Sequence, residues 1–395
     1  MPNLPFPVFL ITLAQTLGMV TAPMMIFVGG FLGLTLAPSS GMATLPIASL
    51  VVGSACAGMP AAFIMKKIGR RNGFVYATLL ALLGSILAFY SVRNGNFWGL
   101  CFSIFLLGMH LAFVQQFRFA ALEWVKPEQA ATTASVVLLG GLFAAWIGPE
   151  LVMLGQNLMA VEFSGVFILL AISHCLLLVL LSYIPFVSIK EKSTDHVGRS
   201  IRQLLSSPGI ITAITCASVA YGVMSLIMTA TPVSMTEILS FPLIETKTVI
   251  QSHIMAMFLP SLITPILLRF FPVAWILLMG IFAMTIAISI ALLNQGYWGY
   301  WFALVFLGLG WNFLFVGGTT LLSQNYSLHE GFNVQAVNEV IVFSTQAFTS
   351  LIAGWLVFNY GWNTTNLLAI PLLMLALLMV MRLFLIKSVQ ASHES

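Results

Sequence analysis

The sequence alternates between long apolar segments and short polar or charged breaks, such as residues 93–96 and 126–129. A helix of about 20 apolar residues is long enough to cross the hydrocarbon core of a bilayer. The twelve segments that approach or exceed this length cover roughly residues 8–34, 43–65, 73–92, 97–122, 130–155, 164–187, 209–235, 248–270, 273–294, 297–323, 333–358 and 364–386. The pattern therefore predicts an all-α integral membrane protein with twelve transmembrane helices.

The few cations of the chain fix the orientation of these helices. Of fifteen lysines and arginines, twelve fall in the breaks after the even-numbered spans or at the C-terminal end. Only Arg93 and Lys247 lie in the opposite loops, and Arg118 lies inside the fourth span. Because cytoplasmic loops carry the excess of lysine and arginine, we expect both termini in the cytoplasm. The expected location is the cell inner (cytoplasmic) membrane, crossed many times.

Composition excludes several classes of function. Hydrophobic residues make up 60% of the chain and charged residues 7%, whereas soluble domains carry about 25% charged residues. The net charge of +4 does not indicate nucleic-acid binding, since the cations lie at helix ends. The four cysteines lie in apolar segments without metal-ligand spacing, and the start lacks the basic region of a signal peptide. Without a nucleophile–base pair or a phosphate-binding motif, we expect no enzyme, no cofactor and no metal.

Two halves of the chain repeat one another. Phe97-Trp98-Gly99 recurs as Tyr297-Trp298-Gly299 at a shift of 200, and residues 108–114 pair with residues 310–316 at a shift of 202. A parallel duplication of six helices places a substrate site near the midplane between the halves. We expect an N-terminal bundle at 1–187, a cytoplasmic linker at 188–208 and a C-terminal bundle at 209–395.

The break after the second span, residues 66–71, holds four cations, Lys66, Lys67, Arg70 and Arg71. One interpretation is a simple anchor that keeps the turn in the cytoplasm. With the twelve spans and the long central linker, however, the chain resembles the major facilitator superfamily of secondary transporters. Gly69-Arg70-Arg71 fits the loop motif of that family, although Ala62 replaces its glycine and Lys66 its aspartate.

Two further stretches carry the resemblance. Residues 140–149, with Gly140-Gly141 and Gly148-Pro149, are similar to part of the glycine/proline motif of proton-linked antiporters, and close helix packing explains them equally well. Residues 228–232 and 310–318 are similar to a bacterial subgroup of the superfamily with no assigned substrate.

Polar side chains inside the spans are candidates for a site because they are costly in a bilayer. The resemblance implies that helices one, four, seven and ten line a central cavity, with His110 and Asn312 at matched depth. The expected substrate-binding residues are His110, Asn312, Gln15, Gln115, Tyr221 and Trp311. The alternative is that these groups only hold neighbouring helices together. His174 falls on the sixth helix, which is peripheral in the family, so we expect a structural role for it.

Charged side chains near the cytoplasmic helix ends are candidates for proton coupling or gating. They are Glu339, Arg118, Glu123, Arg70 and Arg71. The resemblance implies that the inner ends of helices four and eleven converge, so Arg118 and Glu339 are expected to pair across the two halves. Alternatively, Arg118 reaches the cytoplasmic surface by itself and Glu339 bonds locally. Glu123 is the expected acidic partner of the arginines at the 66–71 turn.

These observations predict a secondary transporter that moves a small organic solute by alternating access. Proton-coupled export is the leading mode, and proton-coupled or facilitated uptake of a metabolite or metal chelate is the alternative. A third hypothesis is a membrane receptor or structural protein that kept the fold and lost transport. The expected partners are a small-molecule substrate, protons and the lipid bilayer, with no nucleic acid, and we expect a monomer.

Overall fold

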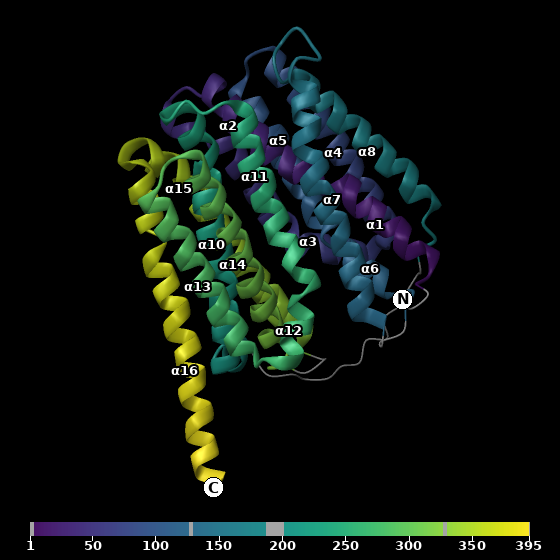
Figure 1. Ribbon diagram of the computed structural model, residues 1–395. Helices are drawn as coiled ribbons and strands as arrows, with labels where there is room; N and C mark the ends of the chain where they lie inside the picture. The colour runs from purple at the N-terminus through teal and green to yellow at the C-terminus, as the bar shows by residue number, and fades with distance from the viewer. Residues whose placement is uncertain (1–3, 126–128, 187–200, 327–329, 395) are drawn as a thin grey trace. The chain divides into compact units, whose positions relative to one another are not determined.

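Figure 1 shows the computed structural model of the chain, which describes residues 4–125, 129–186, 201–326 and 330–394 and is helical throughout its regular elements. Residues 188–200 of the predicted linker therefore lie outside the described part. The helices of the first half are α1 (Phe6–Met19), α2 (Thr21–Leu36), α3 (Leu45–Ile68), α4 (Arg70–Arg93), α5 (Phe97–Val114), α6 (Phe117–Leu122), α7 (Ala130–Gln156) and α8 (Ser164–Tyr183), with a 3-10 turn at Ser40–Met42.

The second half begins with the short α9 (Ile201–Leu204). Its other elements are α10 (Pro208–Val233), a π-helical turn at Ser234–Ile238, α11 (Leu243–Phe258), a 3-10 turn at Leu259–Leu262, α12 (Thr264–Phe270), α13 (Val273–Leu293), α14 (Tyr297–Ser323), α15 (Gly331–Leu367) and α16 (Ile370–Glu394). Long helices run alongside one another, α13 between α14 and α16 (Figure 1). Apolar residues on nearly all sides of each helix explain this bundling.

The described helices account for the twelve predicted spans. Ten continuous helical segments are long and apolar enough to cross a membrane. The last of these, Val334–Leu385, contains two predicted spans, because Gly361 breaks α15 at a φ of 78° that only glycine adopts easily. The remaining span is divided into α11, the 3-10 turn and α12, because Pro260 has no N–H to continue the helix.

By internal contacts the chain divides into two compact units. The first comprises Met1–Glu191 and Thr231–Lys247, and the second comprises Lys192–Ala230 and Thr248–Ser395. The boundary inside α10 falls between Ala230 and Thr231, directly before Pro232 and the π-helical turn. The C-terminal end of α10 and the start of α11 therefore group with the first unit, and the boundaries predicted at 187 and 209 stay a prediction.

Glycines let helices of each unit approach closely. A Cβ on Gly108 of α5 would lie 2.0 Å from the Leu50 carbonyl oxygen of α3, and one on Gly53 of α3 would lie 2.1 Å from the Phe105 carbonyl oxygen of α5. In the second unit, a Cβ on Gly308 would lie 2.7 Å from the His253 carbonyl oxygen of α11. Gly108 and Gly308 thus make similar close approaches to a neighbouring helix, each within its own unit.

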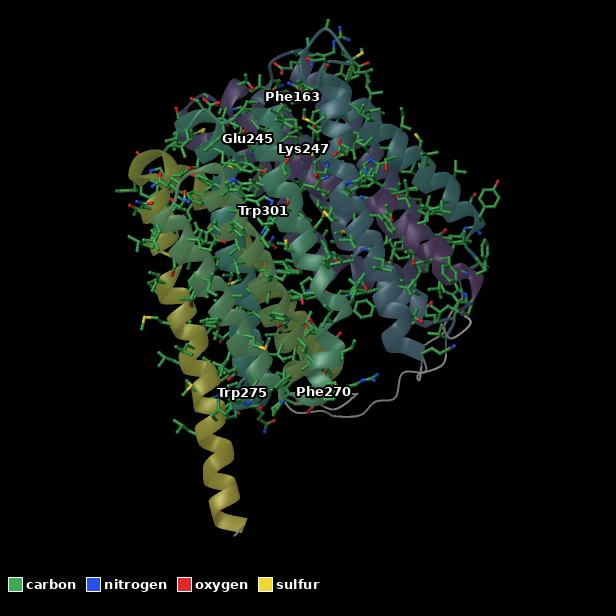
Figure 2. The ribbon with its side chains drawn as sticks, viewed as in Figure 1. Phe163, Glu245, Lys247, Phe270, Trp275 and Trp301 are labelled. Carbon is green, nitrogen blue, oxygen red and sulfur yellow. The ribbon has the colours of Figure 1, made fainter. Side chains whose placement is uncertain are left out.

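The outer surfaces of the units suit a lipid environment. Large apolar side chains such as Phe282 and Leu378 are exposed. Aromatic side chains mark helix ends: in the second unit, Phe270 and Trp275 lie at one end and Trp301 lies toward the other (Figure 2). Trp and Tyr are enriched where membranes meet water, so the pattern agrees with a multi-pass membrane protein.

Candidate functional site

Five aromatic rings meet inside the second unit. This aromatic cluster consists of Tyr221 on α10, Phe258 on α11, Trp311 and Phe315 on α14 and Phe343 on α15. Trp311 and Phe315, one helical turn apart, are stacked with ring centroids 5.0 Å apart. The edge of Tyr221 meets both rings at 5.2 and 5.3 Å. Such arrangements of flat, polarised faces bind other aromatic rings well.

The indole of Trp311 brings a hydrogen-bond donor into this cluster. The side chain is only 5% exposed, and its Nε1 has no hydrogen-bond partner among the described residues. A buried N–H without a partner costs about 1–3 kcal/mol, and a buried Trp usually finds one. Trp311 therefore offers an N–H donor next to an aromatic surface, which is what a ring with acceptor atoms at its edge requires.

The amide of Asn312 holds the broken helix of the second unit together. Its Nδ2 donates to the Met257 carbonyl oxygen at 2.7 Å and to Ser261 Oγ at 2.6 Å, and its Oδ1 accepts from Thr264 Oγ1 at 2.9 Å. These partners surround the 3-10 turn between α11 and α12, where Pro260 interrupts the backbone hydrogen bonds. The structure thus gives Asn312 a structural role, and its contact with substrate stays a prediction.

His110 lies inside the first unit and contacts His174 of α8. The two ring centroids are 5.1 Å apart and the planes are nearly perpendicular. Both side chains are at most 1% exposed. Nδ1 of His110 has no hydrogen-bond partner among the described residues. The imidazole therefore packs toward the sixth span, a neighbour that the depth argument from the sequence did not identify.

The two glutamines occupy different surroundings in the same unit. Gln15 of α1 is buried, its Oε1 has no described hydrogen-bond partner, and it packs where Gly140 of α7 approaches α1. Gln115 is half-buried at the break between α5 and α6. Both remain predicted substrate contacts, and neither belongs to the aromatic cluster.

Side-chain hydrogen bonds join the 66–71 turn to other segments of its own unit. Gly69 adopts a φ of 83°, which lets α4 begin directly after α3. Arg70 Nε donates to the Glu123 carboxylate, and Arg71 donates to the Ser182 carbonyl oxygen at 3.1 Å. The expected pairing of Arg70 with Glu123 is present. Because both residues belong to the first unit, the pair joins helices of one bundle, and its gating role stays a prediction.

A second ion pair in the first unit involves the segment contributed by residues 231–247. Lys247 Nζ lies 2.5 Å from Glu150 Oε1 of α7. Lys247 is at the same end of the unit as Phe163 and Glu245 (Figure 2). The lysine side chain is 10% exposed, so the carboxylate is its compensating charge. This pair links α11 to the first half of the chain.

Arg118 and Glu339 belong to different units, so their expected pairing remains a prediction. Arg118 on α6 places its guanidinium 4.7 Å from the ring centroid of Phe119. Glu339 on α15 is half-buried.

Within the described residues, no group of three or more histidine, cysteine, aspartate or glutamate side chains could hold a metal ion.

The sequence did not single out several residues of these clusters. Phe315 could have been found, since it lies four residues after Trp311 on the same helix face. Phe258 and Phe343 come from other helices and have no sequence signal beyond being aromatic. Thr21 and Ser85, which hydrogen-bond to His174, are hydroxyl residues of a kind common in transmembrane helices.

Comparison with known proteins gives consistent results. The family model described as Major Facilitator Superfamily matches residues 6–344. The chain is 32% identical over 380 residues to the riboflavin transporter RfnT of Brucella anthropi, covering 95% of both chains. It is 26% identical to the uncharacterized MFS-type transporter YdeG of Bacillus subtilis, covering 91% of this chain and 87% of YdeG.

Solved structures of low sequence identity share the fold. A bacterial homologue of the lysosomal transporter Spinster, in an inward-facing state, superposes with a TM-score of 0.68 at 14% identity, covering 95% of both chains. A bacterial homologue of the iron transporter ferroportin, in an outward-facing state, superposes with a TM-score of 0.67 at 15% identity, covering 96% of this chain and 99% of that one.

Proposed function

Because this chain belongs to the major facilitator superfamily, a family of membrane transporters and not of enzymes, we propose that it carries a flat heteroaromatic metabolite, with riboflavin as the first candidate. The aromatic cluster around Trp311 carries this proposal. A relative named as a riboflavin transporter that matches 95% of the chain supports the choice of riboflavin.

The chemistry of riboflavin fits what the cluster offers. Its tricyclic ring is flat and electron-poor, so it stacks on the electron-rich faces of indole and phenol rings. Carbonyl oxygens and ring nitrogens along its edge accept hydrogen bonds, and the Trp311 Nε1–H can donate one. Small-molecule sites typically combine apolar and aromatic walls with few polar groups, which matches the cluster.

The remaining features of the proposal concern coupling and location. The chain acts as a monomer in the lipid bilayer of the cytoplasmic membrane, with both termini in the cytoplasm, as the distribution of its cations favours. Transport is coupled to protons in this proposal, and the histidine side chains of the spans are the candidate proton acceptors. Export by exchange with protons and uptake together with protons both fit this coupling, and vesicles with opposite pH gradients separate them.

The test uses purified protein in liposomes with riboflavin as the probe. Riboflavin exchange at equal pH on both sides should exceed that of empty liposomes, and riboflavin bound to the protein should lose fluorescence through stacking. Trp311→Leu should weaken riboflavin binding about tenfold, because it removes a stacking face and a hydrogen bond worth together about 1.4 kcal/mol or more.

Trp298→Leu is the matched control, since Trp298 is an exposed tryptophan of the same helix. It should leave the affinity unchanged. Equal loss in both variants, or no riboflavin binding and no exchange in the unaltered protein, would reject riboflavin as the substrate. Absence of flux for a panel of heteroaromatic metabolites, with the protein folded, would favour the receptor hypothesis instead.

A further inference from the structure

Four polar side chains from four helices meet inside the first unit. They are Thr21 at the start of α2, Ser85 on α4, His110 on α5 and His174 on α8, and none is more than 1% exposed. His174 Nε2 lies 3.1 Å from Thr21 Oγ1, and His174 Nδ1 lies 3.1 Å from Ser85 Oγ. Neither His174 nor its hydroxyl partners have a role in the proposed substrate site.

The hydrogen bonds of Ser85 favour one tautomer of His174. The Ser85 hydroxyl donates its single proton to the Ala81 carbonyl oxygen at 2.9 Å, so toward His174 it can only accept. Nδ1 of His174 must then carry a hydrogen. In the neutral imidazole, Nε2 is left as an acceptor, and the Thr21 hydroxyl donates to it.

This arrangement also accommodates the protonated form of His174. When a proton is added to Nε2, the Thr21 hydroxyl needs only to rotate so that its oxygen accepts. Nδ1–H continues to donate to Ser85. Both N–H groups of the imidazolium are therefore hydrogen-bonded, which lowers the cost of a charge held away from water. A histidine with a purely structural role requires partners for one protonation state only.

His110 limits the site to one proton. Its ring meets the ring of His174 edge to face at 5.1 Å, and two positive charges at this separation in a buried site repel strongly. Nδ1 of His110 is buried without a described hydrogen-bond partner, so this ring has an unused position for a proton or a donor. The two imidazoles thus form a coupled pair in which protonation of one excludes protonation of the other.

Other titratable groups on the surrounding helices do not compensate this charge. They are Cys56 and the terminal lysines of α3, Tyr76, Tyr90 and the terminal arginines of α4, Cys101 on α5, Glu150 on α7, and Cys175 and Tyr183 on α8, while α1 and α2 carry none. None of those described hydrogen-bonds to either imidazole, and Glu150 is paired with Lys247. A proton held only by hydroxyls can be released again, as a coupling site requires.

We propose that the His110–His174 pair, with Thr21 and Ser85, is the proton-binding site of this transporter and takes up one proton in each transport cycle. This inference rests on the proposed function for the identity of the transported solute but not for proton binding itself. It gives His174 a role beyond the structural one expected from its place on the sixth span.

Proton binding is measured first, without any substrate. Imidazole nitrogen NMR of the purified, 15N-histidine-labelled protein should show one coupled imidazole pair that takes up a single proton as the pH is lowered over the range in which the protein stays folded. His174→Gln should abolish this coupled titration. A pair that stays neutral across the whole range in the unaltered protein would overturn the proposal, whatever the substrate is.

Transport in liposomes with riboflavin as the probe is the second readout. His174→Gln should keep riboflavin exchange at equal pH and lose at least tenfold of the accumulation driven by a pH gradient. Should that variant fail to fold, Ser85→Ala replaces it and should shift the pH at which accumulation is half-maximal. Ser91→Ala is the control, because Ser91 lies on the same helix and bonds only to its own Leu87 carbonyl among described groups.

The outcomes separate the two proposals. Undiminished gradient-driven accumulation in His174→Gln, or the same pH shift in Ser85→Ala and Ser91→Ala, would overturn the proton site. Absence of riboflavin exchange in the unaltered protein would reject the substrate alone, since the NMR titration still decides whether the pair binds a proton.

Discussion

At the scale of single residues, some buried polar groups of this protein have hydrogen-bond partners and others have no described partner. Asn312 has its amide fully engaged by Met257, Ser261 and Thr264. Trp311, the next residue along α14, has an indole N–H with no described partner. A polar group whose hydrogen bonds are made within the protein stabilises the fold. A donor without a described partner, beside aromatic faces, can instead donate to a bound ligand. Adjacent residues of one helix thus serve different purposes.

We predict that Asn312→Ala lowers the free energy of unfolding by about 1–3 kcal/mol, because it leaves several buried polar partners unpaired at a helix break. Thermal unfolding in detergent micelles measures this. Asn359→Ala is the matched control, since the exposed side chain of Asn359 bonds, among described groups, only to the Trp355 carbonyl of its own helix. Equal melting temperatures for the two variants would contradict a structural role for the Asn312 amide.

At the scale of elements, backbone contacts between helices set the architecture of each unit. Gly53 and Gly108 are reciprocal: each lies against a backbone carbonyl of the opposite helix, α5 for the first and α3 for the second. A backbone oxygen cannot rotate away as a side chain can, so an added methyl group must push the two helices apart. Small residues at such crossings are the usual device for close packing in membranes.

Gly108→Ala is therefore predicted to cost about 1–3 kcal/mol of stability through overpacking, and Gly53→Ala should cost a similar amount. Gly58→Ala on α3 provides the contrast, because nothing lies within 4 Å of the added Cβ. The helix preference for alanine should make it neutral or stabilising by up to about 1 kcal/mol. Melting temperatures that rank Gly58→Ala with or below the other two would refute the close α3–α5 contact.

At the scale of the whole molecule, the predicted pairing of Arg118 with Glu339 involves both units. Arg118 belongs to the first unit and Glu339 to the second, and the sequence predicts that both lie near cytoplasmic helix ends. A pair between them would stabilise the conformation that is closed on the inside, and protonation of Glu339 would weaken it. Glu123 does not compete directly for Arg118 in this scheme, since it is paired with Arg70.

Arg118→Glu and Glu339→Arg should each reduce gradient-driven transport about tenfold or more, because each places like charges opposite one another. The double exchange should recover part of the activity. A double-mutant cycle in liposomes measures the coupling free energy. Losses that simply add, with all three proteins inserted and folded, would show that the two residues act independently.

The sequence by itself determined the number of spans, the expected topology and the family. These follow from features that are local along the chain: runs of apolar residues as long as a bilayer is thick, cations in the breaks and the Gly-Arg-Arg motif at the 66–71 turn. It also placed a turn at residues 66–71, where the structure gives Gly69 a φ of 83° that glycine adopts easily.

Only the tertiary structure decided which side chains meet. The helices are apolar on all sides, so the hydrophobic pattern does not reveal which face turns toward a neighbour. Depth along a helix could be counted, but rotation about its axis could not. For that reason the contact of His110 with His174, the partners of Asn312 and the assembly of Phe258, Trp311 and Phe343 into one cluster emerged only when the helices were packed together.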